Sequence, residues 1–216
     1  IYISGYLFSL RVKNWTRGKE EKRNVKLSQR IFKLFDGLTM RTVLRFKAAG
    51  LVHSLIYIGF LGLFAGTVTL EIHHLMPPSL KFLQGTTYIV YSFTLELATI
   101  AYLTGLFWAL ARRLIGTEYR IKTKTTIDDY LTLSLLIFIG ISGITTEAGR
   151  IALENFPDYE KWSFIGYAVG QILNLSNPEL FHRISWVLHV VSFFVFLIAI
   201  PLSKLRHIFT SPINMF

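Results

Sequence analysis

Residues 181–212 form an apolar run that is longer than a bilayer is thick. A helix rises about 1.5 Å per residue, so about 20 apolar residues are enough to cross the hydrocarbon core. Three further runs of this kind cover residues 46–72, 85–110 and 129–152 approximately, and residues 1–10 read as the inner end of another. The sequence therefore predicts an all-α integral membrane protein, with about five transmembrane helices in an antiparallel bundle and the first helix truncated.

Composition and charge agree with this class. The chain is 52% hydrophobic and contains no cysteine, which excludes disulfides, thiolate metal sites and iron–sulfur ligation by its own residues. The net charge of +10 does not indicate nucleic acid, because the basic residues lie between the apolar runs. Nineteen of the 23 Lys and Arg residues fall on one predicted side, in residues 11–47, 112–124 and 204–206.

That asymmetry predicts the orientation, since cytoplasmic loops carry the excess of Lys and Arg. We expect a multi-pass protein of the cytoplasmic (inner) membrane, with its basic loops and C-terminus in the cytoplasm and the lipid bilayer as its surroundings. We interpret residues 1–216 as a single membrane domain. It comprises the end of helix one (1–10), a basic cytoplasmic segment (11–46) and a four-helix core (47–210). Within the basic segment, the apolar spacing of residues 27–44 predicts an amphipathic helix on the membrane surface. The abrupt first and last residues suggest a piece of a longer protein.

All six histidines lie on, or at the ends of, two of the predicted helices. At about 100° per residue, His189 and His207 share one face of the last helix and stand roughly 27 Å apart along its axis, close to the hydrocarbon thickness. An electron-transfer haem takes two neutral imidazoles from opposite sides, so its ligands must lie at similar depth on facing helices. This pattern predicts haem b as the cofactor, with two haems favoured over one.

His53 and His207 both lie near the cytoplasmic ends of their helices, so we take them as the pair at that end. The alternative for such rings is a core histidine bonded to a backbone carbonyl or to water. An unliganded ring inside an apolar run is costly, which favours the ligand interpretation for His53, His189 and His207.

At the outer end, His74 fits a ligand position better than His73, which lies about 160° round the helix from His53. The partner of His74 is either His189 or His182, and His189 is nearer in depth. We therefore predict His53, His207, His189 and His74 as ligands of the haem iron, with His182 and His73 as haem or quinone contacts or as plain helix-end residues.

Four charged residues are candidates for a quinone site or proton path. Glu147, Arg150 and Lys81 lie near the predicted outer edge, and Glu96 is the one acid deep in a membrane helix. Glu147 and Arg150 are three residues apart, so pairing on the helix surface is the simpler alternative. For Glu96 the alternative is a hydrogen bond to a Thr or Tyr of a neighbouring helix.

Several stretches resemble a known family. They are KAAGLVHSLIYIGFLGLFAGT at 47–67, ARRL at 111–114, TTIDDYLTLSLL at 125–136, GITTEAGRIAL at 143–153 and WVLHVVSFFVFLIAIPLSKLRHIFTSPINMF at 186–216. In this order they resemble the gamma-subunit family of respiratory nitrate reductase. They are more similar still to the haem b membrane domains related to heterodisulfide reductase and to the sulfite-reductase-linked membrane complex.

The resemblance implies a five-helix membrane cytochrome b. Such a protein passes electrons between a membrane quinone, as substrate, and a cytoplasmic iron–sulfur partner or fused domain of the heterodisulfide reductase type. It implies His189 as a ligand of the outer haem, and His207 and His53 as ligands too. One departure is Thr67, which stands where the nitrate reductase type has a second histidine. Either His74 replaces that ligand or the outer site differs, so one haem is the alternative to two.

A second class of function also fits a histidine-bearing bundle. A transporter scaffold could use the same histidines to conduct protons or a metal ion. It predicts polar residues spread through several helices, whereas the histidines here are confined to two. The sequence favours the cytochrome.

Overall fold

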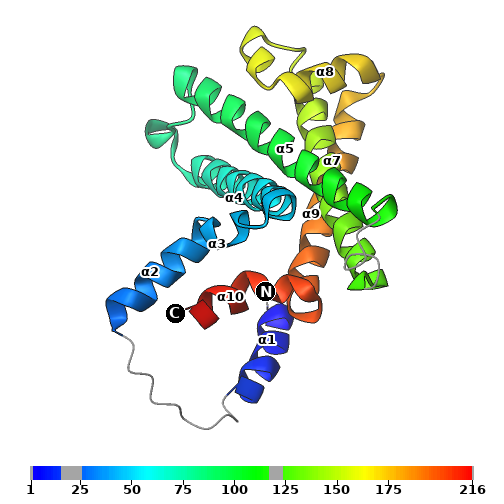
Figure 1. Cartoon of the computed structure of the whole chain (residues 1–216). Coiled ribbons are helices and arrows are strands. Elements are labelled where there is room, and N and C mark those ends of the chain that lie inside the picture. Colours follow the sequence, from blue (N-terminus) through cyan, green and yellow to red (C-terminus); the bar gives the residue numbers. More distant parts are fainter. Residues whose placement is uncertain (1, 16–25, 117–123, 216) are drawn as a thin grey trace.

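The computed structural model of the chain describes residues 2–15, 26–116 and 124–215. The regular structure in these ranges is helical throughout (Figure 1). Its elements are α1 (Tyr2–Trp15), α2 (Leu27–Leu38), α3 (Arg41–Leu44), α4 (Lys47–Leu75), η1 (Pro78–Leu80), α5 (Gly85–Leu114), α7 (Ile127–Leu153), η2 (Asp158–Trp162), α8 (Phe164–Leu173), α9 (Pro178–Leu202), η3 (Lys204–Arg206) and α10 (His207–Met215). The basic residues Arg17, Lys19, Lys22, Arg23, Arg120 and Lys122 of the predicted cytoplasmic segments lie outside the described residues.

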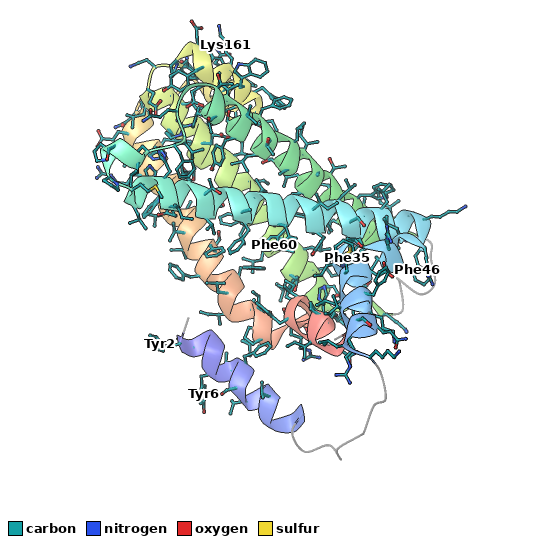
Figure 2. The ribbon with its side chains drawn as sticks, turned by 90° about the vertical axis from the view of Figure 1, so that its left-hand side faces the viewer. Tyr2, Tyr6, Phe35, Phe46, Phe60 and Lys161 are labelled. Carbon is teal, nitrogen blue, oxygen red and sulfur yellow. The ribbon has the colours of Figure 1, made fainter. Side chains whose placement is uncertain are left out.

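Four of these helices, α4, α5, α7 and α9, are long and apolar enough to cross a membrane. Only 22% to 33% of the residues in their most apolar stretches are buried within protein. Exposed apolar surface on this scale is stable against lipid rather than water, and helices satisfy their own backbone groups there. Aromatic side chains such as Tyr2, Tyr6 and Phe46 project from the outside of the molecule (Figure 2). The all-α membrane fold predicted from the sequence is confirmed.

The bundle is built from two close helix pairs, α4 with α5 and α7 with α9, which meet where α5 packs on α7. Gly59 allows the first pair to approach closely, because a Cβ there would lie 2.6 Å from the backbone nitrogen of Tyr102. Tyr102 is almost fully buried, and its hydroxyl donates to the carbonyl of Leu136 on α7 at 3.0 Å. This side chain thereby ties the two pairs together at the centre of the core.

The two ends of the bundle differ in structure. At one end, η2 and α8 lie over the ends of α5 and α7, and we call this the α8 end (Figure 1). At the other, α1, α2 and α10 gather with both ends of the chain, and we call this the α10 end (Figure 1). Lys161 in η2 marks the α8 end in Figure 2.

The last membrane helix differs from the prediction. The sequence predicts one helix over residues 181–212, but α9 ends at Leu202 and the chain continues through η3 into α10. Pro201 lacks a backbone N–H and weakens the last turn of α9, and the extended backbone of Ser203 (φ −106°, ψ −174°) ends the helix. The hydroxyl of Ser203 then accepts the N–H of Leu205 at 3.1 Å, which starts η3.

The helices before the core also differ in detail. The first helix continues to Trp15 rather than ending near residue 10. The amphipathic stretch predicted over residues 27–44 divides into α2 and α3 at Met40, whose φ of 59° is left-handed. Because an L-residue in this conformation cannot continue a right-handed helix, the chain turns there toward α4.

Candidate functional site

Two histidines from distant parts of the chain meet near the α10 end. The ring centroids of His53 on α4 and His207 on α10 are 6.0 Å apart, with their planes inclined by 60°. The Nδ1 atom of His207 lies 2.8 Å from the carbonyl oxygen of Lys204, which fixes the orientation of its ring. The Nδ1 atom of His53 is buried and has no hydrogen-bond partner among the described residues.

Both rings line one large pocket between α4, α5, α7 and α9, and α2 and α10 contribute to its wall. Its volume is about 800 Å³, within the range of sites that bind small molecules and cofactors. Phe60, Tyr102 and Phe196 form part of its apolar lining, and the centroids of the two phenylalanine rings are 5.5 Å apart. The lining thus combines flat aromatic surfaces with two imidazoles.

Four cationic side chains line the same pocket: Arg112, Arg113, Lys124 and Lys204. The Nζ atom of Lys204 lies 2.7 Å from Oδ2 of Asp129, whose carboxylate also accepts the N–H of Thr126 at 2.8 Å. This ion pair fixes η3, and with it the start of α10, against the first turn of α7. An anionic group of a ligand in this pocket would therefore meet several positive charges.

His189 and His182 on α9 both contact α7. The Nδ1 atom of His189 lies 3.0 Å from the hydroxyl of Ser142, and Nδ1 of His182 lies 3.0 Å from the carbonyl oxygen of Thr146. Gly143 leaves space for the His189 ring, because a Cβ there would lie 3.3 Å from Cε1. Both rings therefore have partners within the protein.

The remaining two histidines lie at the end of α4. His73 accepts the backbone N–H of Leu83 at 3.1 Å through Nδ1, so it supports the connection between α4 and α5, on which Lys81 lies half-buried. His74 is exposed, and the structure records no contact between it and His189. The structure thus brings His53 and His207 together, but it does not join His74 to His189.

Arg150 organises a polar cluster at the α8 end. Its guanidinium donates to Glu160 at 2.7 Å, to Glu154 at 3.1 Å and to the hydroxyl of Tyr88 at 3.1 Å. Tyr88 in turn donates to Glu160 at 2.7 Å. The expected surface pair between Arg150 and Glu147 is therefore replaced by contacts across α5, α7 and η2.

Glu160 is fully buried within this cluster. Burial alone would raise the pKa of its carboxyl, but the hydrogen bond and charge of Arg150, together with the hydrogen bond from Tyr88, outweigh that effect. The pKa of Glu160 consequently lies below its ordinary value, and the carboxylate is ionised at neutral pH.

Glu96 and Glu147 lie beside the start of α8. Glu96 is 2% exposed, and its Oε1 accepts the backbone N–H groups of Ile165 at 3.1 Å and Gly166 at 3.4 Å. The expected partner was a Thr or Tyr side chain, and the observed partner is the N-terminus of a helix. The Glu147 side chain lies against Gly166, where a Cβ would come within 2.7 Å of Oε2.

Some residues of these sites carry no signal that sequence analysis could use. Ser142, Tyr88 and Glu160 acquire partners only through the packing of distant segments. Asp129 is different, because its position three residues after Thr126 is the spacing of a capping box, which the structure contains. That spacing could have identified Asp129 as part of the cap of α7, but not as the partner of Lys204.

Comparison with known proteins gives the chain a family. Residues 41–216 match the nitrate reductase gamma subunit family. The chain is 27% identical, over 99% of its length, to the EtfAB:quinone oxidoreductase of Syntrophomonas wolfei subsp. wolfei (strain DSM 2245B / Goettingen). It is 24% identical, over its whole length, to the probable iron-sulfur-binding oxidoreductase FadF of Bacillus subtilis (strain 168).

The chain spans 31% of the length of each of these two relatives. No solved structure is significantly similar to it. The family match covers most of the chain, including the helices that bear His53, His189 and His207. The chain belongs to the nitrate reductase gamma subunit family.

Proposed function

We propose that this chain is a membrane electron-transfer subunit or domain that binds haem b between His53 and His207. The observation that carries the proposal is the 6.0 Å separation of the two imidazole centroids within a pocket of about 800 Å³. Neither His182 nor His189 has a second imidazole beside it in the described part of the chain.

The spacing of the rings fits an iron between them. A bond from a metal to an imidazole nitrogen is about 2 Å long, and the ring centre lies roughly 1 Å beyond the nitrogen, so two opposed ligands have centroids about 6 Å apart. The buried and unpartnered Nδ1 of His53 also marks this ring as different from His189 and His182, which are bonded to α7.

The rest of the pocket fits a porphyrin. Phe60, Tyr102 and Phe196 offer apolar faces to a flat macrocycle, and the cationic side chains of the lining suit its propionate groups. The backbone carbonyl of Lys204 fixes the ring of His207, as outer partners of metal-binding histidines commonly do. When bound, haem b supplies a one-electron carrier, whereas the protein sets its position and surroundings.

The wider role follows from the relatives and the charge distribution. One relative is named a quinone oxidoreductase and the other an iron–sulfur-binding oxidoreductase. We infer that electrons pass between a membrane quinone and a cytoplasmic iron–sulfur partner, or a fused domain of the heterodisulfide reductase type. The excess of Lys and Arg supports a cytoplasmic α10 end, and thus a cytoplasmic membrane protein whose basic loops face inward.

A second haem, with His189 as one ligand, remains a prediction of the sequence. The bond from His189 to Ser142 would leave its other ring nitrogen for a ligand. The exposed His74 has no contact with it. The proposal therefore rests on the site at His53 and His207.

Substitution of single histidines tests the proposal. We expect H53A and H207A each to lose the haem of this pocket, and the matched variant H182A to retain it, because His182 is bonded to the Thr146 carbonyl outside the pocket. Haem content of each purified variant would be measured by pyridine haemochrome. Retention of the full haem content in both H53A and H207A would refute the site.

A further inference from the structure

Two carboxyl groups at the α8 end share one neighbour. Glu96 of α5 accepts the N–H of Gly166 at 3.4 Å, and the Glu147 side chain of α7 packs on the open side of the same glycine. Both carboxyls therefore lie around the same glycine. Both acids lie at the N-terminus of α8. The contacts of these two side chains thus join α5 and α7 to the start of α8.

Neither acid forms an ion pair in the described part of the chain. The nearest cation is Arg150, and its guanidinium is bound to Glu160, Glu154 and Tyr88. The other titratable groups facing Glu147 are Tyr91 and Tyr88 on α5 and Glu160 on η2, none of which is positive. Two neighbouring carboxyls in such surroundings cannot both be ionised at low cost.

The hydroxyl of Ser163 lies beside one acid of this pair. Ser163, in the turn before α8, is fully buried. Its hydroxyl lies close to the carboxyls of Glu147 and Glu160, but it forms a hydrogen bond of good geometry with neither, and Oε2 of Glu160 is also without a partner among the described residues. Buried hydroxyls are normally satisfied, so this one marks a place where a proton or a bridging water belongs.

We propose that Glu96 and Glu147 form a carboxyl pair that binds one exchangeable proton. The proton resides mainly on Glu147, because two backbone N–H groups at the start of α8 stabilise the charged form of Glu96. Glu147 is half-buried whereas Glu96 is 2% exposed, so exchange of the proton with the surroundings would proceed through Glu147. The pair gives this end of the bundle a group that takes up and releases a proton, independently of the haem proposed at the other end.

Infrared spectroscopy of the purified protein tests this directly. At neutral pH we expect a carbonyl band of one protonated carboxylic acid, which shifts on exchange into D2O and disappears on alkaline titration. We expect the band to be absent in E147Q, and to be lost at a lower pH in E96Q, where the neighbouring charge is gone. The matched control E154Q removes a carboxylate that is paired with Arg150 at the same end, and it should keep the band unchanged.

Folding is checked by circular dichroism and gel filtration, and G166A serves as a second variant. Its new Cβ would displace the flexible end of Glu147, which should shift the band without removing any acid. The proposal is overturned if wild-type protein has no such band at neutral pH, or if the band survives in E147Q and does not respond to E96Q. No step of this test uses haem, so the infrared result can be interpreted even if the haem proposal fails.

Discussion

The imidazole rings of His53 and His207 are 6.0 Å apart, although one lies on the first long membrane helix and the other beyond the end of the last. The break after Leu202 makes this possible. A continuous helix would have carried residue 207 onward along the axis of α9, whereas η3 and α10 return the chain toward α2 and α4. The ion pair between Lys204 and Asp129 fixes that turn against α7.

Replacement of Asp129 should lower the stability of the protein more than replacement of Lys204. The side chain of Lys204 is 58% exposed, and a pair of this kind contributes less than about 1 kcal/mol. Asp129 also completes the cap of α7 through Thr126, so its loss should cost about 1–2 kcal/mol. We expect D129A to lower the free energy of unfolding in detergent more than K204A does. Equal losses in the two variants would show that the cap contributes nothing.

The close approach of α4 to α5 predicts a steric effect at Gly59. A Cβ at this position would lie 2.6 Å from the backbone nitrogen of Tyr102 and 2.7 Å from the carbonyl oxygen of Ala98, and backbone atoms cannot move aside. At Gly62 the nearest atom is the Cβ of Ala98 at 3.0 Å. We expect G59A to reduce resistance to SDS-induced unfolding clearly, and the matched variant G62A to reduce it less. The reverse order would contradict the observed packing.

The buried carboxylate of Glu160 predicts acid sensitivity at the α8 end. Its pKa is lowered in the folded state, so its contribution to stability is fully present above the ordinary Glu pKa of about 4.3. That contribution is lost as the pH falls through the lower folded value. The unfolding temperature of wild type should therefore drop on acidification below about pH 4. E160Q should lack this part of the drop, and an identical pH profile in both proteins would argue against the ion pair.

Replacement of Arg150 should lower the stability of the protein more than replacement of Glu160. R150Q would leave Glu160 buried without its cation, at a cost of about 3 kcal/mol. E160Q leaves Arg150 paired with Glu154, so it should cost less. Chemical or thermal unfolding of both variants at neutral pH would compare them. A larger loss in E160Q than in R150Q would mean that the buried Glu160 carboxylate does not depend on Arg150.

Much of the fold could be predicted from hydrophobic run length alone. The four long helices begin and end within a few residues of the predicted ranges, apart from the break after Leu202, because membrane thickness sets their length. The exception at Pro201 shows the limit of this argument. A proline near the end of an apolar run can either bend the helix or end it, and only tertiary packing decides between them.

The candidate site could be predicted only in part. The sequence placed His53 and His207 at the same end of two facing helices. The structure also brings them together, but His207 lies on α10, after the break at Leu202, rather than on α9. The same reasoning paired His74 with His189, but it could not include the bond of His189 to Ser142 or the exposure of His74. Charge positions were visible in the sequence, whereas the partners of Arg150 and Glu96 depend on η2 and α8 folding over the bundle.

The most direct test of the account is the reduced-minus-oxidised absorption spectrum of the purified protein. We predict a Soret band and a reducible α band of a bis-imidazole haem b, retained in H182A and lost from the His53 and His207 site in H53A and H207A. A colourless wild-type protein, purified from cells supplied with haem, would contradict the account. It would favour the alternative in which the same histidines serve a proton- or metal-ion-conducting transporter.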